Sequence, residues 1–370
     1  MIIGVPKEIK IQEYRVAIIP SGVIKLVTAG HEVLVERGAG IGSAYLDLEY
    51  EQAGARIVSA KEAWAAQLVV KVKEPLNSEY NYLQGQLLFT FLHLAGVEKE
   101  LTYRLLESGT TAIAYETLEN RQGDLPLLAP LSAIAGNMAA LVGSYYLAKF
   151  NHGNGVQLGS VLGKRHGKVL VIGDGVVGFH AARALNSMGA NVFQAGLTNS
   201  KVGLQKTGEL KGIEYLYSEK KTIAKNCLDA DLVIGAVLNK GTKAPYVVTE
   251  EMLKSMCKGA VVVDVSIDQG GCIETSRATT HDNPIYEQYG VIHYCVANMP
   301  GAYPRTATIA LCSETLIYIQ QLAETGVSAF HLQEISAKAI NIYKSRITNK
   351  QVATSLNLLE SYTPINEIWA

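Results

Sequence analysis

A glycine-rich turn in the middle of the chain limits the possible folds more than any other feature of the sequence. Residues 168–172 are largely apolar and predict a buried strand, and the turn Gly-Asp-Gly-Val-Val-Gly follows at 173–178. Residues 179–188 then have the pattern of a helix. A strand, a G-x-G-x-x-G turn and a helix in this order are typical of a dinucleotide-binding Rossmann unit.

Each glycine of the turn has its own physical role in such a unit. Gly173 permits the tight turn, Gly175 lets the backbone approach a pyrophosphate, and Gly178 lets the helix pack closely on the strand. The first turn of the helix offers unpaired N–H groups and the positive end of its dipole to the phosphates. An ordinary Gly-rich turn is the plainer alternative, and the flanking strand and helix argue against it.

The acid that usually accompanies this turn is absent from its expected place. In Rossmann units a carboxylate about 20 residues further on binds the ribose 2′-hydroxyl. Residues 191–201 contain no acid, and Gly196 stands where the second strand should end. Only Ser200 and Lys201 are near enough in sequence to approach a 2′-phosphate. We expect weaker NAD binding and weaker discrimination against NADP, and we expect Gly196→Asp to restore both.

The chain is long enough for two domains, since it has 370 residues. Apolar runs ahead of the turn predict strands at 2–5, 31–36, 68–72, 87–91 and 111–115. A second series of strands and helices runs from 168 to about 296. Strands that alternate with helices predict parallel sheets covered by helices on their faces.

Two crossings between these series contain prolines and precede long predicted helices. The segment 126–130 leads to a helix at 133–150, which Ser132 can cap. The segment 298–304 leads to a helix at 306–323. Both crossings predict a chain that leaves its first domain and later returns to it.

We therefore predict an α/β protein of two Rossmann-like domains with parallel sheets. The nucleotide domain, 129–302, is inserted into a discontinuous substrate domain of residues 1–128 and 303–370, and two long helices join them. The glycine-containing segment 151–167 is predicted to be a loop.

Composition and charge argue against several other classes of protein. Hydrophobic residues make up 48% of the chain and charged residues 18%, which suits a folded protein. The formal net charge is −1 without a basic patch, which argues against a nucleic-acid partner. No apolar run approaches the roughly 20 residues of a membrane span, and the N-terminus lacks the pattern of a signal peptide. We expect a cytoplasmic protein without a membrane partner.

Neither the cysteines nor the histidines are spaced as metal ligands. The five cysteines form no C-x-x-C pair, and the eight histidines show no H-x-x-x-H pair. We expect reduced, structural thiols and no metal site.

Several charged or titratable residues follow apolar runs, where open α/β sheets bind ligands. Lys71 and Lys73 share one face of a predicted strand, because strand side chains alternate. His93 follows the next apolar run, and Asp268 stands on a glycine-containing turn after another. Surface charges, a core histidine and a turn-forming aspartate are the plainer interpretations of these residues and of Arg15.

Eight short strings, in order along the chain, resemble the alanine dehydrogenase family. The resemblance runs from residue 1 to about 325 and is thin beyond it. The strings lie at 4–8 (with Arg15), 71–75, 91–95, 112–117, 126–128, 234–238, 263–272 and 298–301. Two positions depart from the family's pattern, since Gly196 replaces an acid and Asn137 replaces an arginine.

The resemblance implies oxidative deamination of L-alanine to pyruvate and ammonium, with NAD as the hydride acceptor. It implies Arg15 and Lys73 as substrate ligands, His93 and Asp268 as catalytic groups, and a homo-oligomer, commonly a hexamer. Besides the glycine turn and Gly196, it implies cofactor contacts at Ser132, Val176, Val177, Lys201, Ser218, Val237, Leu238, Val265, Ser266, Ile267, Asp268, Arg277, Val296, Ala297, Asn298 and Met299.

The residue types suit that chemistry on independent grounds. An arginine can bind a substrate carboxylate bidentately, and a lysine can polarise a keto oxygen. A histidine can carry the protons that the amine and the attacking water must exchange. Two alternatives remain at this point: a sister oxidoreductase, of the transhydrogenase-subunit or saccharopine type, and a non-catalytic protein that binds NAD or a small acid.

Overall fold

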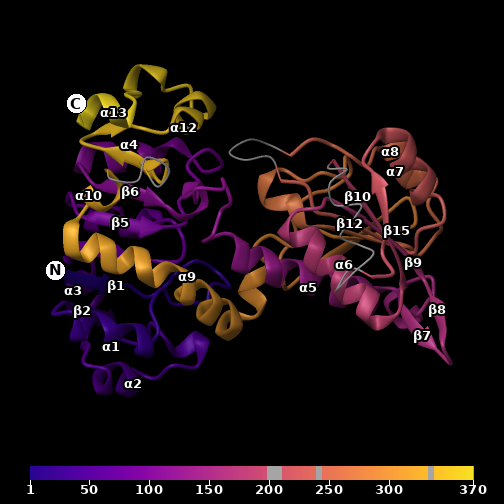
Figure 1. Cartoon of the computed structure of the whole chain (residues 1–370), viewed down its shortest axis with the longest axis horizontal. Helices are drawn as coiled ribbons and strands as arrows, with labels where there is room; N and C mark the ends of the chain where they lie inside the picture. The colour runs from indigo at the N-terminus through magenta and orange to yellow at the C-terminus, as the bar shows by residue number, and fades with distance from the viewer. Residues whose placement is uncertain (198–210, 239–243, 332–336, 370) are drawn as a thin grey trace. The chain divides into compact units, whose positions relative to one another are not determined.

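Two sheets with the same strand order organise the structure, which is a computed structural model (Figure 1). It describes residues 1–197, 211–238, 244–331 and 337–369. The chain divides into a first unit, Met1–Leu131 with Tyr303–Ala370, and a second unit, Ser132–Ala302.

The sheet of the first unit has the strand order β17-β16-β6-β5-β4-β1-β2-β3. Its first six strands along the chain are parallel, and β16 and β17 extend it in antiparallel fashion. The strands are β1 (Ile2–Val5), β2 (Glu32–Glu36), β3 (Arg56–Val58), β4 (Leu68–Val70), β5 (Leu87–Thr90), β6 (Thr111–Ala114), β16 (Ile340–Tyr343) and β17 (Arg346–Ile347).

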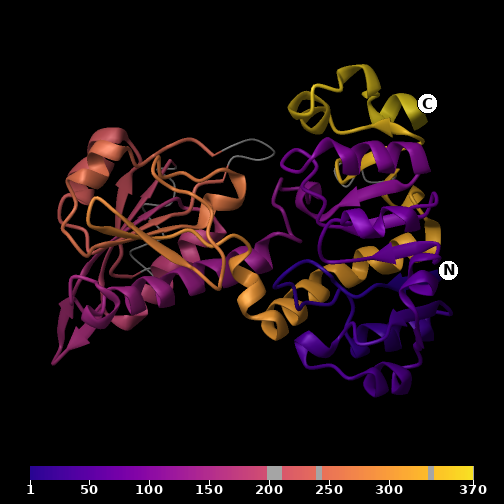
Figure 2. The ribbon, with the colours of Figure 1, turned by 180° about the vertical axis from the view of Figure 1, so that it is seen from behind.

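Helices of the first unit pack on this sheet: α3 contacts β1 and β2, and α9, the long orange helix in Figure 2, contacts β4. Pro20 begins α1, and Gly30 follows its end with a φ of +86°, a conformation that favours glycine. The helices are α1 (Pro20–Thr28), α2 (Asp47–Gln52), α3 (Ala60–Trp64), α4 (Lys99–Ser108), α9 (Pro304–Thr325), α10 (Ser328–His331), α12 (Lys350–Ser355) and α13 (Ile365–Trp369).

The second unit contains a sheet of order β11-β10-β9-β12-β13-β15-β14, in which only β14 is antiparallel. Its strands are β9 (Lys168–Ile172), β10 (Asn191–Gly196), β11 (Glu214–Tyr217), β12 (Leu232–Gly235), β13 (Val261–Asp264), β14 (Ile285–Gln288) and β15 (Val291–Tyr294). Its helices are α5 (Ala129–Tyr146), α6 (Val176–Met188), α7 (Lys220–Cys227) and α8 (Glu250–Lys254).

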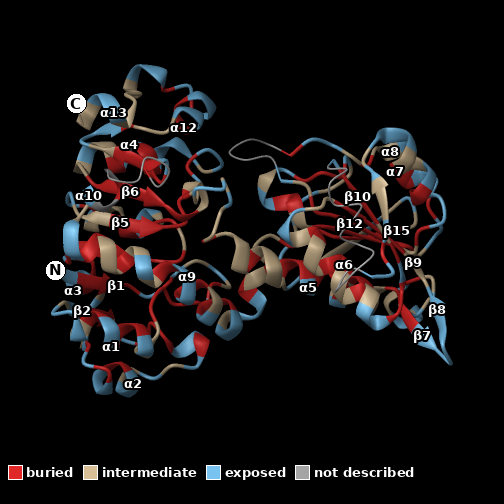
Figure 3. Ribbon diagram, viewed as in Figure 1, coloured by how far each residue is buried: buried red, intermediate tan, exposed pale blue. Residues whose placement is uncertain are grey.

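Both sheets follow the Rossmann order 3-2-1-4-5-6, so the prediction of an α/β protein with two Rossmann-like, mainly parallel sheets is confirmed. The central strands of both sheets are buried on both faces, and the outer surfaces of the helices are exposed (Figure 3). Such burial explains why the strands read as continuous apolar runs. None of the helices in the described ranges combines the length and the hydropathy needed to cross a membrane.

Two local predictions were wrong, and one pair of strands was not predicted. The segment 151–167 holds a hairpin of β7 (Gly159–Val161) and β8 (Lys164–His166), whose polar strands lack a hydrophobic pattern. Helix α5 begins at Ala129, because proline is tolerated in a first turn, and Ser132 therefore lies inside the helix and does not cap it. The strands β16 and β17 were not expected, since they add to the sheet only after the chain returns.

Gly4→Ala should destabilise the first unit, because β1 and α3 approach closely there. An added Cβ would overlap the Ala63 carbonyl group and lie 2.9 Å from Ala66 Cβ. We expect the free energy of unfolding in urea to fall by about 1–3 kcal/mol. Gly96→Ala is the control, since its Cβ would meet no atom closer than 3.6 Å. Equal losses in the two variants would contradict the close approach.

Candidate active site

Arg15 lies in the loop between β1 and α1, where Glu13 holds its guanidinium group. Arg15 Nε donates to Glu13 Oε1 at 2.7 Å, and a terminal nitrogen donates to Oε2 at 2.5 Å. Burial raises the pKa of Glu13, but Arg15, helped by the charge of Lys73, lowers it to about 2. The paired side chains are almost completely buried, so the plane of the guanidinium group is fixed.

Lys73 follows a buried ion cluster at the end of β4. Lys71 Nζ donates to Glu8 Oε2 at 3.1 Å and to Glu79 Oε1 at 3.0 Å. Burial alone would lower the pKa of Lys71, but the two carboxylates raise it. Glu8 Oε1 also accepts the backbone N–H groups of Val72, at 2.6 Å, and Lys73, at 3.2 Å. Glu8 therefore fixes the backbone that carries the Lys73 side chain.

The predicted strand face shared by Lys71 and Lys73 does not exist, because β4 ends at Val70. Lys71 is fully buried among carboxylates, whereas Lys73 is only partly buried. The two lysines thus have different environments, since Lys71 is fully buried and Lys73 is partly exposed.

His93 is exposed, and its backbone is held in an unusual conformation just after β5. Its φ is +49°, in the left-handed region. The Glu116 carboxylate accepts the backbone N–H groups of Leu92, at 3.2 Å, and His93, at 2.6 Å. The Phe91 ring stacks on the imidazole with an interplanar angle of 4°. Sequence reasoning missed the role of Glu116, although it belongs to one of the family strings.

The structure brings Arg15, Lys73 and His93 to one end of the first sheet, where the strands β1, β4 and β5 finish. The strands that precede them, β1, β4 and β5, are neighbours in the sheet. Thr90 Oγ1 donates to the Lys73 carbonyl oxygen at 2.9 Å and so ties the ends of β4 and β5 together. This end of the sheet can bind a small carboxylate through two cations and present an exposed imidazole to it.

The glycine turn of the second unit fits a pyrophosphate. A Cβ on Gly173 would lie 2.7 Å from the Ala236 carbonyl carbon, and one on Gly178 would lie 2.8 Å from that of Gly173. A Cβ on Gly175 would meet no atom of the described residues within 4 Å, so among these residues the space beside it is open. Helix α6 begins at Val176 with no side-chain cap and no acid in its first turn. Its first N–H groups therefore suit an anion.

A buried carboxylate shapes the turn that carries Asp268. Asp264 accepts the backbone N–H groups of Ser266, Cys272 and Ile273 at 2.9–3.0 Å. Burial raises the pKa of Asp264 despite these hydrogen bonds. Asp268 is exposed on this turn, and its carboxylate accepts the Asn298 N–H at 3.3 and 3.4 Å. Sequence reasoning also missed Asp264, whose signal is a charge at the end of an apolar strand.

The other predicted cofactor residues are dispersed over the second unit. Ser266 Oγ joins two strand ends, accepting from Val237 N–H at 3.0 Å and donating to its carbonyl oxygen at 2.7 Å. Ser218 N–H donates to the Gly196 carbonyl oxygen at 2.8 Å. The Arg277 guanidinium group lies over the Tyr286 ring, 4.0 Å from its centroid.

The remaining predicted positions differ in how far their side chains are exposed to solvent. Val176 and Leu238 are exposed, Met299 and Ile267 are buried, and Lys201 lies outside the described residues. The intermediate positions are Ser132, Val177, Val265, Ala297 and Asn298, and Val296 is buried beside Thr279.

Asp174 and Tyr215 occupy the space beside Gly196, at the end of β10. A Cβ on Gly196 would lie 2.5 Å from Asp174 Cγ and would overlap Tyr215 Oη. Tyr215 Oη donates to Asp174 Oδ2 at 2.7 Å. The effect of Gly196→Asp on NAD binding stays a prediction, and the new side chain would have to displace the ends of both of these side chains.

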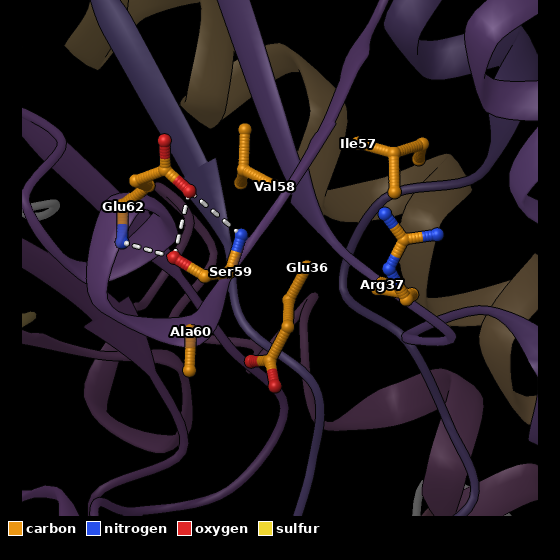
Figure 4. Close-up of a pocket in the computed structure, with 7 residues that line it drawn as sticks. All are labelled: Glu36, Arg37, Ile57, Val58, Ser59, Ala60 and Glu62. Carbon is orange, nitrogen blue, oxygen red and sulfur yellow. Dashed lines mark hydrogen bonds between the residues drawn. The ribbon is translucent and has the colours of Figure 1, made fainter.

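A hollow of about 420 Å³ lies elsewhere in the first unit, at the ends of β2 and β3 (Figure 4). Its lining residues are Glu36, Arg37, Ile57, Val58, Ser59, Ala60 and Glu62. Ser59 and Glu62 are engaged with each other as the capping box of α3. None of the predicted site residues lines this hollow. In the described parts of the chain, no three His, Cys, Asp or Glu side chains are grouped as metal ligands.

Comparison with known proteins gives matches over almost the whole chain. Family models match residues 4–135 (alanine dehydrogenase/PNT, N-terminal domain) and 139–350 (C-terminal domain of the same family). The alanine dehydrogenase of Staphylococcus saprophyticus is 48% identical over 374 residues, covering 99% of both chains. That of Bacillus subtilis is 48% identical over 362 residues, covering 96% of this chain and 95% of the relative.

Solved structures agree with these matches. An L-alanine dehydrogenase superposes with a TM-score of 0.92 at 46% identity, covering 96% of this chain and 99% of the other. A transhydrogenase from Sinorhizobium meliloti superposes with a TM-score of 0.80 at 25% identity, covering 95% and 99%.

Glu13→Gln should make the protein less stable at neutral pH and change its pH dependence. The folded pKa of Glu13 is about 2 against an ordinary 4.5, so its contribution is complete above about pH 4.5 and is lost as the pH falls towards 2. At about 1.4 kcal/mol per pKa unit, this contribution is on the order of 3 kcal/mol.

Urea unfolding of both proteins at pH 7 and pH 3 tests this. We expect the difference in free energy of unfolding to narrow at the lower pH. Glu107→Gln, an exposed partner of Arg104, is the control and should change stability by less than about 1 kcal/mol. A difference that is the same at both pH values would contradict the assignment.

Proposed function

The chain belongs to the alanine dehydrogenase/PNT family, and from this we propose that it catalyses the NAD-dependent, reversible oxidative deamination of L-alanine to pyruvate and ammonium. The observation that carries the proposal is the gathering of Arg15, Lys73 and His93 at one end of the first sheet in a chain nearly half identical to alanine dehydrogenases over its full length. Formation of NADH from L-alanine, and its consumption with pyruvate and ammonium, test it directly.

In this proposal Arg15 and Lys73 bind the substrate. Glu13 fixes the guanidinium plane and offsets its charge, so Lys73 supplies the net positive charge that a carboxylate requires. Lys73 can also polarise the keto oxygen of pyruvate. Because Glu8 anchors the Lys73 backbone, the Lys73 side chain extends towards the substrate from a fixed position.

His93 and Asp268 carry the protons. Oxidation of the α-carbon leaves an imine, to which water adds before ammonium leaves, and each step transfers a proton. His93 is exposed, and Glu116 fixes its backbone, which suits a group that exchanges protons with a substrate. Asp268 is placed by the Asp264 turn, where a carboxylate can orient the attacking water.

NAD, when bound, supplies the hydride acceptor. The open space at Gly175 and the start of α6 suit its pyrophosphate. We assign the remaining family positions, including Ser266, Val237 and Asn298, to the nicotinamide end of the site, since they lie at the ends of β12, β13 and β15.

The alternatives receive less support. The transhydrogenase from Sinorhizobium meliloti shares the fold at 25% identity, against 46–48% for alanine dehydrogenases. A non-catalytic protein that binds NAD or a small acid would not require His93 or Asp268 for proton transfer. NADH formation that depends on alanine excludes both alternatives.

We further propose, from the family, a cytoplasmic homo-oligomer, commonly a hexamer. Light scattering coupled to size-exclusion chromatography measures the subunit number, and a monomer of 39.9 kDa would contradict the proposal.

His93→Asn and Asp268→Asn should each remove most turnover. Asparagine tolerates the left-handed backbone at position 93 and cannot serve as a base. We expect kcat to fall by about 10²–10⁴, the usual contribution of a positioned proton-transfer group. The Kd of NADH should stay within about twofold, because the adenosine and pyrophosphate contacts do not involve these side chains. His166→Asn, an exposed histidine on β8, is the control. Full turnover in both variants would refute the assignment.

Arg15→Lys should chiefly weaken pyruvate binding. It keeps the charge that Glu13 needs but loses the planar fork that binds a carboxylate. We expect the KM of pyruvate to rise by about tenfold or more, corresponding to a lost charge-assisted hydrogen bond. Arg104→Lys, on the exposed face of α4, should leave the KM unchanged. A KM that does not respond to Arg15→Lys would contradict the role.

A further inference from the structure

We propose that Asp174 supplies the carboxylate that selects NAD over NADP, in place of an acid at the end of β10. The inference rests on the proposed NAD site and adds the residue that sets its specificity. Asp174 is the second residue of the glycine turn, and Gly196 is the last residue of β10. In other Rossmann units the carboxylate comes from the strand end, and here it comes from the turn.

The position of the carboxylate carries the proposal. A side chain on residue 196 would begin 2.5 Å from both Cγ and Oδ2 of Asp174. The Asp174 carboxylate therefore fills the volume that an acid at the strand end would enter. In this fold a carboxylate at that place contacts the ribose 2′-hydroxyl. The contact depends on where the carboxylate lies and not on which residue provides it.

Tyr215 holds this carboxylate from the neighbouring strand. It stands on β11 opposite Gln194, two residues before the end of β10. Its hydroxyl donates to Asp174 Oδ2 at 2.7 Å. A carboxylate has about four lone-pair sites and can therefore accept a ribose hydroxyl in addition to this tyrosine. Tyr215 is a positioning residue in this proposal, because it acts on the cofactor through Asp174.

The same contacts explain why residue 196 is glycine. Gly196 does not have a positive φ, so its backbone conformation does not require glycine. Tyr215 Oη and the Asp174 carboxylate occupy the place of a Cβ, so a larger residue would have to displace the ends of both side chains. Glycine at residue 196 thus goes together with the Asp174 carboxylate and the Tyr215 hydroxyl, which fill the space left by the missing acid.

Discrimination follows from charge. A carboxylate at this place accepts a hydrogen bond from the 2′-hydroxyl of NAD and repels the 2′-phosphate of NADP. The natural protein should therefore bind NADH clearly more tightly than NADPH, even though β10 ends without an acid.

Fluorescence titrations with NADH and NADPH test the proposal without relying on turnover. We expect Asp174→Ala to raise the Kd of NADH by about tenfold or more and not to raise that of NADPH, so the preference collapses. Asp174→Asn keeps the shape and removes the charge, and it should tighten NADPH binding. Tyr215→Phe should raise the Kd of NADH by a few-fold, a smaller change of the same sign as that of Asp174→Ala. Glu214→Ala, a neighbouring exposed acid on β11, is the matched control and should change neither Kd.

Circular dichroism shows whether each variant is folded. If Asp174→Ala does not fold, Asp174→Asn and Tyr215→Phe still test the proposal. An unchanged NADH to NADPH ratio in folded Asp174 variants would overturn the proposal and leave alanine dehydrogenase activity standing. A natural protein that binds NADPH as tightly as NADH would also overturn it. A natural protein that binds neither and does not oxidise alanine would overturn this inference and the proposed function together.

Discussion

Carboxylates that accept backbone N–H groups, buried in the case of Glu8 and Asp264 and half-buried in the case of Glu116, hold the polar loops at the ends of the strands, and the proposed site depends on them. Glu8 holds the segment after β4, Glu116 the segment after β5, and Asp264 the turn after β13. A buried carboxylate is costly unless it is paired, and burial raises the pKa of both Glu8 and Asp264. Several N–H donors offset this cost and at the same time fix the backbone. Each proposed reacting residue stands on a segment anchored in this way, since Glu13 also accepts the Arg15 backbone N–H at 3.1 Å.

The two units share a strand order but differ in the segment that comes after the first strand. In the second unit β9 runs directly into the glycine turn and α6. In the first unit the chain after β1 instead makes a long loop, which carries Arg15, before α1 begins at Pro20. One topology therefore supplies an open helix start in one unit and a buried cation in the other. This difference accounts for the proposed cofactor site and the proposed substrate site on sheets of the same kind.

Much of this arrangement is visible in the sequence, because parallel strands buried on both faces produce continuous apolar runs. The runs at 68–72 and 87–91 locate β4 and β5 to within two residues. The hairpin β7–β8 escapes prediction because its strands are polar and mostly exposed. The assignment of Lys71 and Lys73 to one face fails because β4 ends before them, and period-two alternation ends with the strand.

The sequence by itself determined the dinucleotide-binding turn, the two parallel sheets and the residues that follow the strand ends. These are local signals, carried by neighbouring residues. Only the tertiary structure decided how the missing acid at Gly196 is replaced, because Asp174, Gly196 and Tyr215 are separated along the chain and meet through the pairing of β9, β10 and β11. The same holds for Glu8 and Glu116, whose backbone partners lie 64 and 23 residues away. Contacts of this kind depend on register and packing, and no local pattern encodes them.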